Sequence, residues 1–78
     1  MPESNPSAEL VAFMVKGLVS DLSAVRVNVT EGGRMLEVET TEDDRGRVIG
    51  RQGRVVKAMR AVLEASRDGR DVRLEIID

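Results

Sequence analysis

The sequence contains no cysteine and no histidine, and Phe13 is its only aromatic residue. Without cysteine the chain can form neither disulfides nor thiolate metal sites, and without histidine it lacks the usual zinc ligand and the commonest general base. The sequence also has no nucleophile elbow or other recognisable catalytic group. We therefore expect a protein that is not an enzyme and that holds no metal or cofactor.

Long hydrophobic stretches are absent as well. The longest apolar run covers residues 10–15, far below the roughly 20 residues that a membrane span requires. The first residues carry no positive charge of the kind that begins a signal peptide. We expect a soluble, cytoplasmic protein. Its 78 residues leave room for one domain with a small core, which we place at residues 7–78 after a flexible N-terminus at residues 1–6.

The spacing of apolar residues predicts a first helix near the N-terminus. Asn5 and Pro6 suit a helix cap and a first turn, so the helix should start near residue 6 or 7. An apolar stripe at helical spacing carries it to about residues 20–23, and the same pattern places Phe13 near the core. The stripe consists of Leu10, Val11, Met14, Val15 and Leu18.

A β-hairpin follows this helix. Three valines between residues 25 and 29 alternate with polar residues, which predicts a half-buried strand. The turn is Glu31-Gly32-Gly33-Arg34, because paired glycines accept the positive φ angles of tight hairpins. Leu36 and Val38 then alternate with glutamates in the returning strand.

Two helices and a last strand complete the pattern. The segment from Thr41 to Asp44 has the spacing of a capping box, so a short helix should run to about Ile49. A second helix over residues 54–66 has an apolar arc opposite a cationic one. A glycine closes that helix, and alternation over residues 72–76 predicts a final strand. The predicted order of elements is therefore α-β-β-α-α-β.

Positive charge is concentrated in one segment of the chain. Six of the 12 basic residues lie between residues 45 and 63, where there is no acidic residue, and the remaining six stand against 14 acidic residues. A local cationic field of this kind attracts a polyanion even though the net charge is −2. The six residues are Arg45, Arg47, Arg51, Arg54, Lys57 and Arg60.

The tetrad Gly50-Arg51-Gln52-Gly53 lies inside this basic segment. Its two glycines let the backbone approach a ligand closely, and we expect the amides from Arg51 to Arg54 to face outward at a helix N-terminus, where a phosphate group binds readily. Lys57 and Arg60 would extend the positive track. The alternative is a tight turn with solvated arginines, because two glycines at this spacing are common by chance. The neighbouring cations favour a phosphodiester chain as the ligand.

Residues 46–54 read Gly-Arg-Val-Ile-Gly-Arg-Gln-Gly-Arg, and this segment resembles the signature of the K-homology (KH) RNA-binding domain, whose Gly-x-x-Gly loop clamps about four nucleotides by their backbone. The element order is similar to the type II form of that domain. The resemblance implies an α+β fold, a single type II KH-like domain with a three-stranded sheet and helices packed on one face. Over residues 8–78 the chain resembles the small stand-alone bacterial KH proteins of the KH protein A family.

The resemblance also implies a binding site and partners. Bases of single-stranded RNA would lie in a groove between the glycine loop with its two helices and an edge strand, which we assign to residues 36–40. Members of the family are RNA chaperones that form homodimers, pair with a second KH protein, the Jag-like KH protein B, and are linked with cell shape and peptidoglycan homeostasis. The implied RNA-binding residues are Gly50, Arg51, Gln52, Gly53, Arg54, Arg47, Lys57, Val48, Ile49 and Arg60, with Val48 and Ile49 under the groove floor.

Two other functions compete with RNA binding. The main alternative is a protein-interaction subunit of a KH heterodimer, whose own RNA binding is weak or vestigial. A DNA-binding helix-turn-helix is disfavoured by the hairpin before the helices and by the glycines at both ends of the turn. Because Phe13 is the only aromatic side chain that could stack on a base, we expect RNA binding to be weak and salt-sensitive, with little sequence preference.

Overall fold

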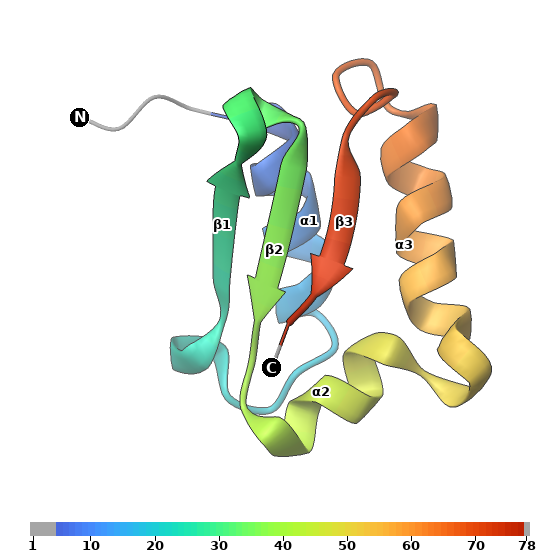
Figure 1. The fold of residues 1–78 in the computed structure, drawn as a ribbon. Helices are drawn as coiled ribbons and strands as arrows, with labels where there is room; N and C mark the ends of the chain where they lie inside the picture. The colour runs from blue at the N-terminus through green and yellow to red at the C-terminus, as the bar shows by residue number, and fades with distance from the viewer. Residues whose placement is uncertain (1–4, 78) are drawn as a thin grey trace.

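The computed structural model describes residues 5–77, and within them three α-helices and three strands follow the predicted order (Figure 1). The predicted α+β fold is confirmed. Residues 1–4, the larger part of the predicted flexible N-terminus, and residue 78 lie outside the described residues. The elements are α1 (Pro6–Lys16), η1 (Leu22–Ala24), β1 (Arg26–Thr30), η2 (Glu31–Gly33), β2 (Met35–Glu39), α2 (Glu42–Ile49), η3 (Arg51–Gly53), α3 (Arg54–Ala65) and β3 (Arg73–Ile76), where η marks a 3₁₀ turn.

The three strands form a mixed sheet with β2 in the centre. β1 pairs antiparallel with β2, which places Val29 opposite Leu36, and β3 pairs parallel with β2, which places Leu74 beside Leu36. The backbone from Glu31 to Gly33 has positive φ angles, so the predicted hairpin and its turn are confirmed. Parallel strands require a long crossover connection, and α2 and α3 provide it between β2 and β3.

The core lies between one face of the sheet and the helices. In Figure 1, α1 lies behind the sheet and α3 runs alongside β3. Each helix contributes side chains to the core. Burial of one such side chain stabilises the fold by about 1.5 to 3 kcal/mol. The largest fully buried side chains are Val11, Val15, Leu36, Val38, Val48 and Leu63.

The first helix begins as predicted but ends early. Asn5 is its N-cap, and the helix stops at Lys16, four to seven residues before the predicted end. The amides of Ser20 and Asp21 donate to the carboxylate of Asp44, each at 3.0 Å. Because these amides bind a distant side chain, they cannot continue the helical hydrogen-bond ladder. Over residues 5–77, no helix combines the length and the hydrophobicity of a membrane span.

The prediction that Phe13 lies near the core is wrong. Val11 and Val15 are fully buried, whereas Phe13 is 79% exposed. At about 100° per residue, Phe13 lies about 200° around the helix from Val11. The rotation of α1 that buries the two valines therefore directs the aromatic ring towards solvent.

Candidate nucleic-acid interface

The glycine tetrad ends α2 and begins α3, as predicted. The amide of Gly50 closes α2 by donating to the carbonyl of Gly46 at 2.8 Å. The backbone then has positive φ angles at Gly50 (79°), Gln52 (58°) and Gly53 (74°), and Gln52 is unusual there because a side chain disfavours this conformation. These angles turn the chain sharply and leave the loop at the corner where α2 meets α3 (Figure 1).

The two glycines of the loop are needed for different reasons. A Cβ atom at Gly50 would lie 2.3 Å from Val55 Cγ2 and 2.8 Å from the Val55 amide nitrogen. A Cβ atom at Gly53 would meet nothing closer than Lys57 Cε at 3.9 Å. Gly50 is therefore required both by its backbone conformation and by the close approach of the first turn of α3, and Gly53 only by its left-handed conformation.

Half of the amides that we expected to face outward are used inside the loop. The amide of Gly53 donates to the carbonyl of Gly50 at 3.0 Å, and the amide of Arg54 donates to the carbonyl of Arg51. For these two amides the prediction is wrong, because the 3₁₀ turn η3 satisfies them. Within residues 5–77 the amides of Arg51 and Gln52 have no main-chain acceptor, so they are the donors that the loop can offer to an anion.

Three cations, called here the loop cations, extend from this corner: Arg51, Arg54 and Lys57. All three are exposed, and none forms an ion pair with a carboxylate of the described residues. Arg54 donates to the side-chain oxygen of Gln52 at 3.2 Å, which leaves its charge uncompensated. Unpaired cations beside free amides at the start of a helix attract phosphate groups, so this corner can hold a phosphodiester backbone.

The other two cations assigned to the site have partners within the protein. The guanidinium of Arg47 lies 3.6 Å from the carboxylate of Asp44 and also donates to the hydroxyl of Ser20. Arg60 donates from Nε and Nη2 to the carbonyl oxygen of Leu74, at 3.1 and 2.9 Å. The structure therefore divides the predicted basic track, since the loop cations are available while Arg47 and Arg60 are held by internal hydrogen bonds.

The assignment of residues 36–40 as the edge strand of the groove is wrong. Those residues belong mainly to β2, which is the central strand, and the edge strand beside α3 is β3. A groove of about 400 Å³ lies between these two elements, lined by Arg60 and Glu64 of α3 and by residues 70–75. Of the two residues expected under the groove floor, Val48 is fully buried and Ile49 partly buried.

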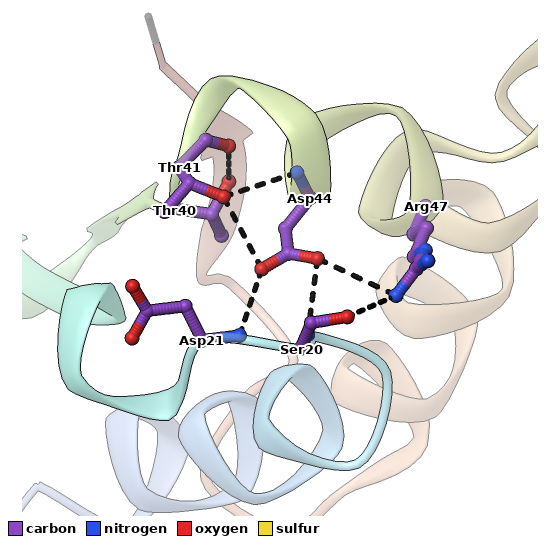
Figure 2. Close-up of polar contacts among 6 residues, drawn as sticks. All are labelled: Ser20, Asp21, Thr40, Thr41, Asp44 and Arg47. Atoms are coloured by element: carbon purple, nitrogen blue, oxygen red, sulfur yellow. Dashed lines mark hydrogen bonds and ion pairs between the residues drawn. The ribbon is translucent and has the colours of Figure 1, made fainter.

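A buried carboxylate ties the N-terminus of α2 to the segment after α1 (Figure 2). Asp44 is 2% exposed. Its carboxylate accepts hydrogen bonds from the amides of Ser20 and Asp21 and also from the hydroxyl of Thr41, at 3.2 Å. Thr41 is the N-cap of α2, as predicted. The two amides, with smaller contributions from Thr41 and Arg47, hold the pKa of Asp44 below its ordinary value in spite of the burial.

We expect Asp44 to make the protein less stable in acid. The folded-state pKa lies below the ordinary value of 3.8, so the stability that Asp44 contributes is fully present above about pH 5 and is lost as the pH falls through the folded pKa. At neutral pH, Asp44→Asn should lower the melting temperature by about 10 °C, because it weakens several buried hydrogen bonds to a charged group.

Thermal denaturation followed by circular dichroism measures this effect. Between about pH 5 and about pH 2 the melting temperature of Asp44→Asn should fall less than that of the unchanged protein, because the amide does not titrate. Asp43→Asn, at the exposed neighbouring position, should behave like the unchanged protein. Equal acid dependence for all three would rule out this role for Asp44.

Sequence reasoning missed the contacts of Asp44 and of Arg60. The sequence marks Asp44 as one of three acids in a first turn, and nothing local distinguishes the buried one. It marks Arg60 as one cation of an exposed helix face. Their partners at Ser20 and Leu74 lie 24 and 14 positions away in the sequence, so only the three-dimensional packing identifies them.

The comparisons with known proteins identify the family that the chain resembles. The chain matches the family model described as "KhpA/KhpB, KH domain" over residues 8–76. It is 40% identical to the "RNA-binding protein KhpA" of Borreliella burgdorferi, with all of both chains covered. It is 42% identical to the protein of that name from Leifsonia xyli subsp. xyli, covering 91% of this chain and 96% of the relative, and 42% identical to that from Streptomyces coelicolor, covering 90% of each. No solved structure matches the chain significantly.

The family match covers nearly all of the described residues and includes the glycine loop with both of its helices. The relatives are similar to this chain over almost their whole length. The chain therefore belongs to the KhpA family of KH-domain proteins, which is a non-enzymatic family.

Proposed function

We propose that this protein binds single-stranded RNA by gripping its backbone at the Gly50–Gly53 loop. The observation that supports the proposal most strongly is the set of loop cations, which are exposed and lack carboxylate partners within residues 5–77. The relatives named RNA-binding protein KhpA support RNA rather than another polyanion as the ligand.

The mechanism follows from the geometry of the loop. A phosphate oxygen would accept from the amides of Arg51 and Gln52, and the two arginine side chains of the loop would neutralise this phosphate and its neighbour. The absence of a Cβ atom at Gly53, where the Cβ position is open, allows the sugar-phosphate chain to lie against the main chain. Lys57, one turn into α3, would meet the next phosphate along the strand.

Stacking contributes little to this binding. The only aromatic ring belongs to Phe13, on α1, whereas the loop joins α2 to α3. The 1 to 3 kcal/mol or so that a stacked base contributes in other single-strand binders is therefore not available from a ring at the loop. Affinity would depend on phosphate contacts, and binding should be weak and strongly dependent on salt.

The salt dependence of binding tests this mechanism. For single strands, log K falls with log salt by about 0.7 for each phosphate neutralised, so three loop cations should give a slope near −2. Arg51→Ala should make the slope shallower by about 0.7, because one phosphate contact is lost. Fluorescence anisotropy with an unstructured RNA oligonucleotide over a salt series measures it.

The matched control is Arg67→Ala. Arg67 is also exposed but lies beyond the far end of α3, so its removal changes the net charge equally without touching the loop. Its slope should equal that of the unchanged protein. Equal slopes for Arg51→Ala and Arg67→Ala would mean that the loop does not hold the phosphates.

The wider role proposed here is that of a cytoplasmic RNA chaperone and post-transcriptional regulator. Binding through the backbone suits a chaperone, because it accepts many sequences. On the same family resemblance we propose homodimers, a heterodimer with the Jag-like KH protein B, and a link to cell shape and peptidoglycan homeostasis. Crosslinking and sequencing of bound RNA in cells, with and without the loop substitutions, would test the regulatory role.

A second candidate function is that of a protein-interaction subunit. The exposed ring of Phe13 (79%) and the exposed side chain of Leu22 (54%) favour it, since large apolar side chains in water often mark an interface. In that case the isolated protein would not bind RNA even at low salt and would do so only with its KH partner. Binding by the isolated protein would instead support the loop mechanism.

A further inference from the structure

The helix that leads into the glycine loop buries little apolar surface, and only near its end. α2 has two apolar residues, Val48 and Ile49, of which the first is fully buried and the second partly buried. Both lie in its last turn. A helix of about two turns is at most marginally stable by itself in water, so the first turn of α2 depends on other contacts.

The buried carboxylate of Asp44 holds this first turn (Figure 2). Its Oδ1 atom accepts from the amide of Ser20 and its Oδ2 atom from the amide of Asp21, each at 3.0 Å. Because two adjacent main-chain amides bind different oxygens, the contact fixes the orientation of the carboxylate as well as its position. Arg47 reaches the hydroxyl of Ser20 as well, but from an exposed side chain. Asp44 therefore links the first turn of α2 rigidly to the segment after α1.

The position of the glycine loop depends on the direction of α2. The amide of Gly50 closes the helix on the carbonyl of Gly46, and the amides of Arg51 and Gln52 are the next two along the chain. If the first turn were released, α2 could pivot about the buried side chain of Val48, and the loop would turn with it. A contact at the start of the helix thus influences the groups that follow its end.

The amides of the loop tolerate less displacement than the loop cations. A hydrogen bond from an N–H group weakens steeply when its angle falls below about 120°, and a main-chain amide cannot move without the loop. The loop cations have long side chains with several rotatable bonds and can follow a phosphate group that has shifted. A tilt of α2 would therefore remove amide hydrogen bonds while the charge contacts persist.

We propose that Asp44 is a positioning residue for RNA binding, which holds the amides of Arg51 and Gln52 where a phosphate group can accept from both. Asp44 is too deeply buried to contact RNA itself. The inference rests on the proposed RNA binding at the Gly50–Gly53 loop and adds to it a residue that acts through the direction of α2.

The substitution Asp44→Asn tests this role because position and charge predict opposite effects. The change removes a negative charge, which by charge alone should strengthen binding of a polyanion. It also leaves one of the two amides without a carboxylate oxygen, so the positioning role predicts weaker binding, by about tenfold. The loss should be the same at every salt concentration, with an unchanged slope, because the loop cations remain. Fluorescence anisotropy with an unstructured RNA oligonucleotide measures it, at a temperature at which circular dichroism shows every variant folded.

Three further variants make the result decisive. Asp43→Asn makes the same change of charge at the exposed neighbouring position and should bind as tightly as the unchanged protein or slightly more tightly. Val11→Ala leaves a cavity in the core beneath α1, so it lowers stability and should leave the affinity unchanged. Thr41→Val removes a weaker contact to the carboxylate; it should reduce the affinity by less, and it serves as the test if Asp44→Asn does not fold.

The possible outcomes separate this inference from the proposed function. Weaker binding by Asp44→Asn, with Asp43→Asn and Val11→Ala undiminished, supports the positioning role. Undiminished binding by both Asp44→Asn and Thr41→Val overturns that role and leaves the loop mechanism intact. An equal loss in Asp44→Asn and Val11→Ala also overturns it, because general destabilisation would then explain the effect. Absence of binding by the unchanged protein overturns the proposed function, and the inference about Asp44 with it.

Discussion

The double substitution Arg51→Asp with Gln52→Asp should weaken RNA binding by at least about 100-fold, because placing like charges against each other costs several kcal/mol. The two new carboxylates would lie beside the amides that are expected to bind phosphate and would repel it. The fold should survive, since both side chains are exposed and aspartate tolerates the left-handed conformation that Gln52 adopts. A mobility-shift assay measures the binding, and thermal denaturation measures the stability.

The single substitution Arg51→Asp can be compared with an equal change of charge elsewhere, which controls for long-range repulsion. Arg51→Asp and Arg67→Asp both change the net charge by two, and both positions are exposed. We expect a large loss of affinity for the first and a small loss for the second. Undiminished RNA binding by the double aspartate variant would refute the assignment of the loop as the binding site.

Gly50→Ala should destabilise the protein by about 3 kcal/mol or more and abolish RNA binding at the same time. Gly50 has φ 79° and ψ 169°, a region that is essentially restricted to glycine and costs other residues about 1 to 3 kcal/mol. The new methyl group would also collide with the backbone nitrogen of Val55, 2.8 Å from the Cβ position. Backbone cannot move aside as a side-chain end can, so α3 would have to shift at its first turn. Urea denaturation measures the loss of stability.

Gly32→Ala provides a control for a positive φ angle without a steric contact. Gly32 also has a positive φ, but a Cβ atom there would meet nothing within 4 Å. Its cost should be the left-handed strain alone, about 1 to 2 kcal/mol, with RNA binding unchanged. Equal destabilisation by the two substitutions would mean that the contact between Gly50 and Val55 is unimportant.

The sequence predicts well those parts of the fold that depend on neighbouring residues. The paired glycines at the hairpin turn, the cap at Thr41 and the break at the glycine tetrad each reflect chemistry within four residues, and the structure has all three where they were expected. The element order follows from these local signals. The glycine loop, as the most local feature of the candidate site, could therefore be placed from the sequence alone.

The errors arise where distant segments meet. The end of α1 depends on hydrogen bonds from the chain after it to the carboxylate of Asp44. Local helix propensity takes no account of so distant a residue. The prediction that residues 36–40 form a wall of the groove is wrong because it depends on the order of the strands. The alternation of side chains along the sequence does not reveal which strand is central. The prediction for Phe13 is wrong because it relied on the apolar character of the side chain. It gave too little weight to the position of Phe13 on the helix, two residues from each buried valine. The contact of Arg60 with Leu74 required the packing of α3 on β3.

The parallel pairing of β2 with β3 has a consequence for synthesis of the chain. Met35 pairs with Arg73, 38 positions later, so a ribosome adding about 5 to 20 residues per second needs about 2 to 8 s between them. During this interval the nascent hairpin has an unpaired edge on β2, where another chain could add a strand. Closing so long a loop also slows folding. Translation speed between these two strands is therefore expected to influence how much of the protein aggregates before it folds.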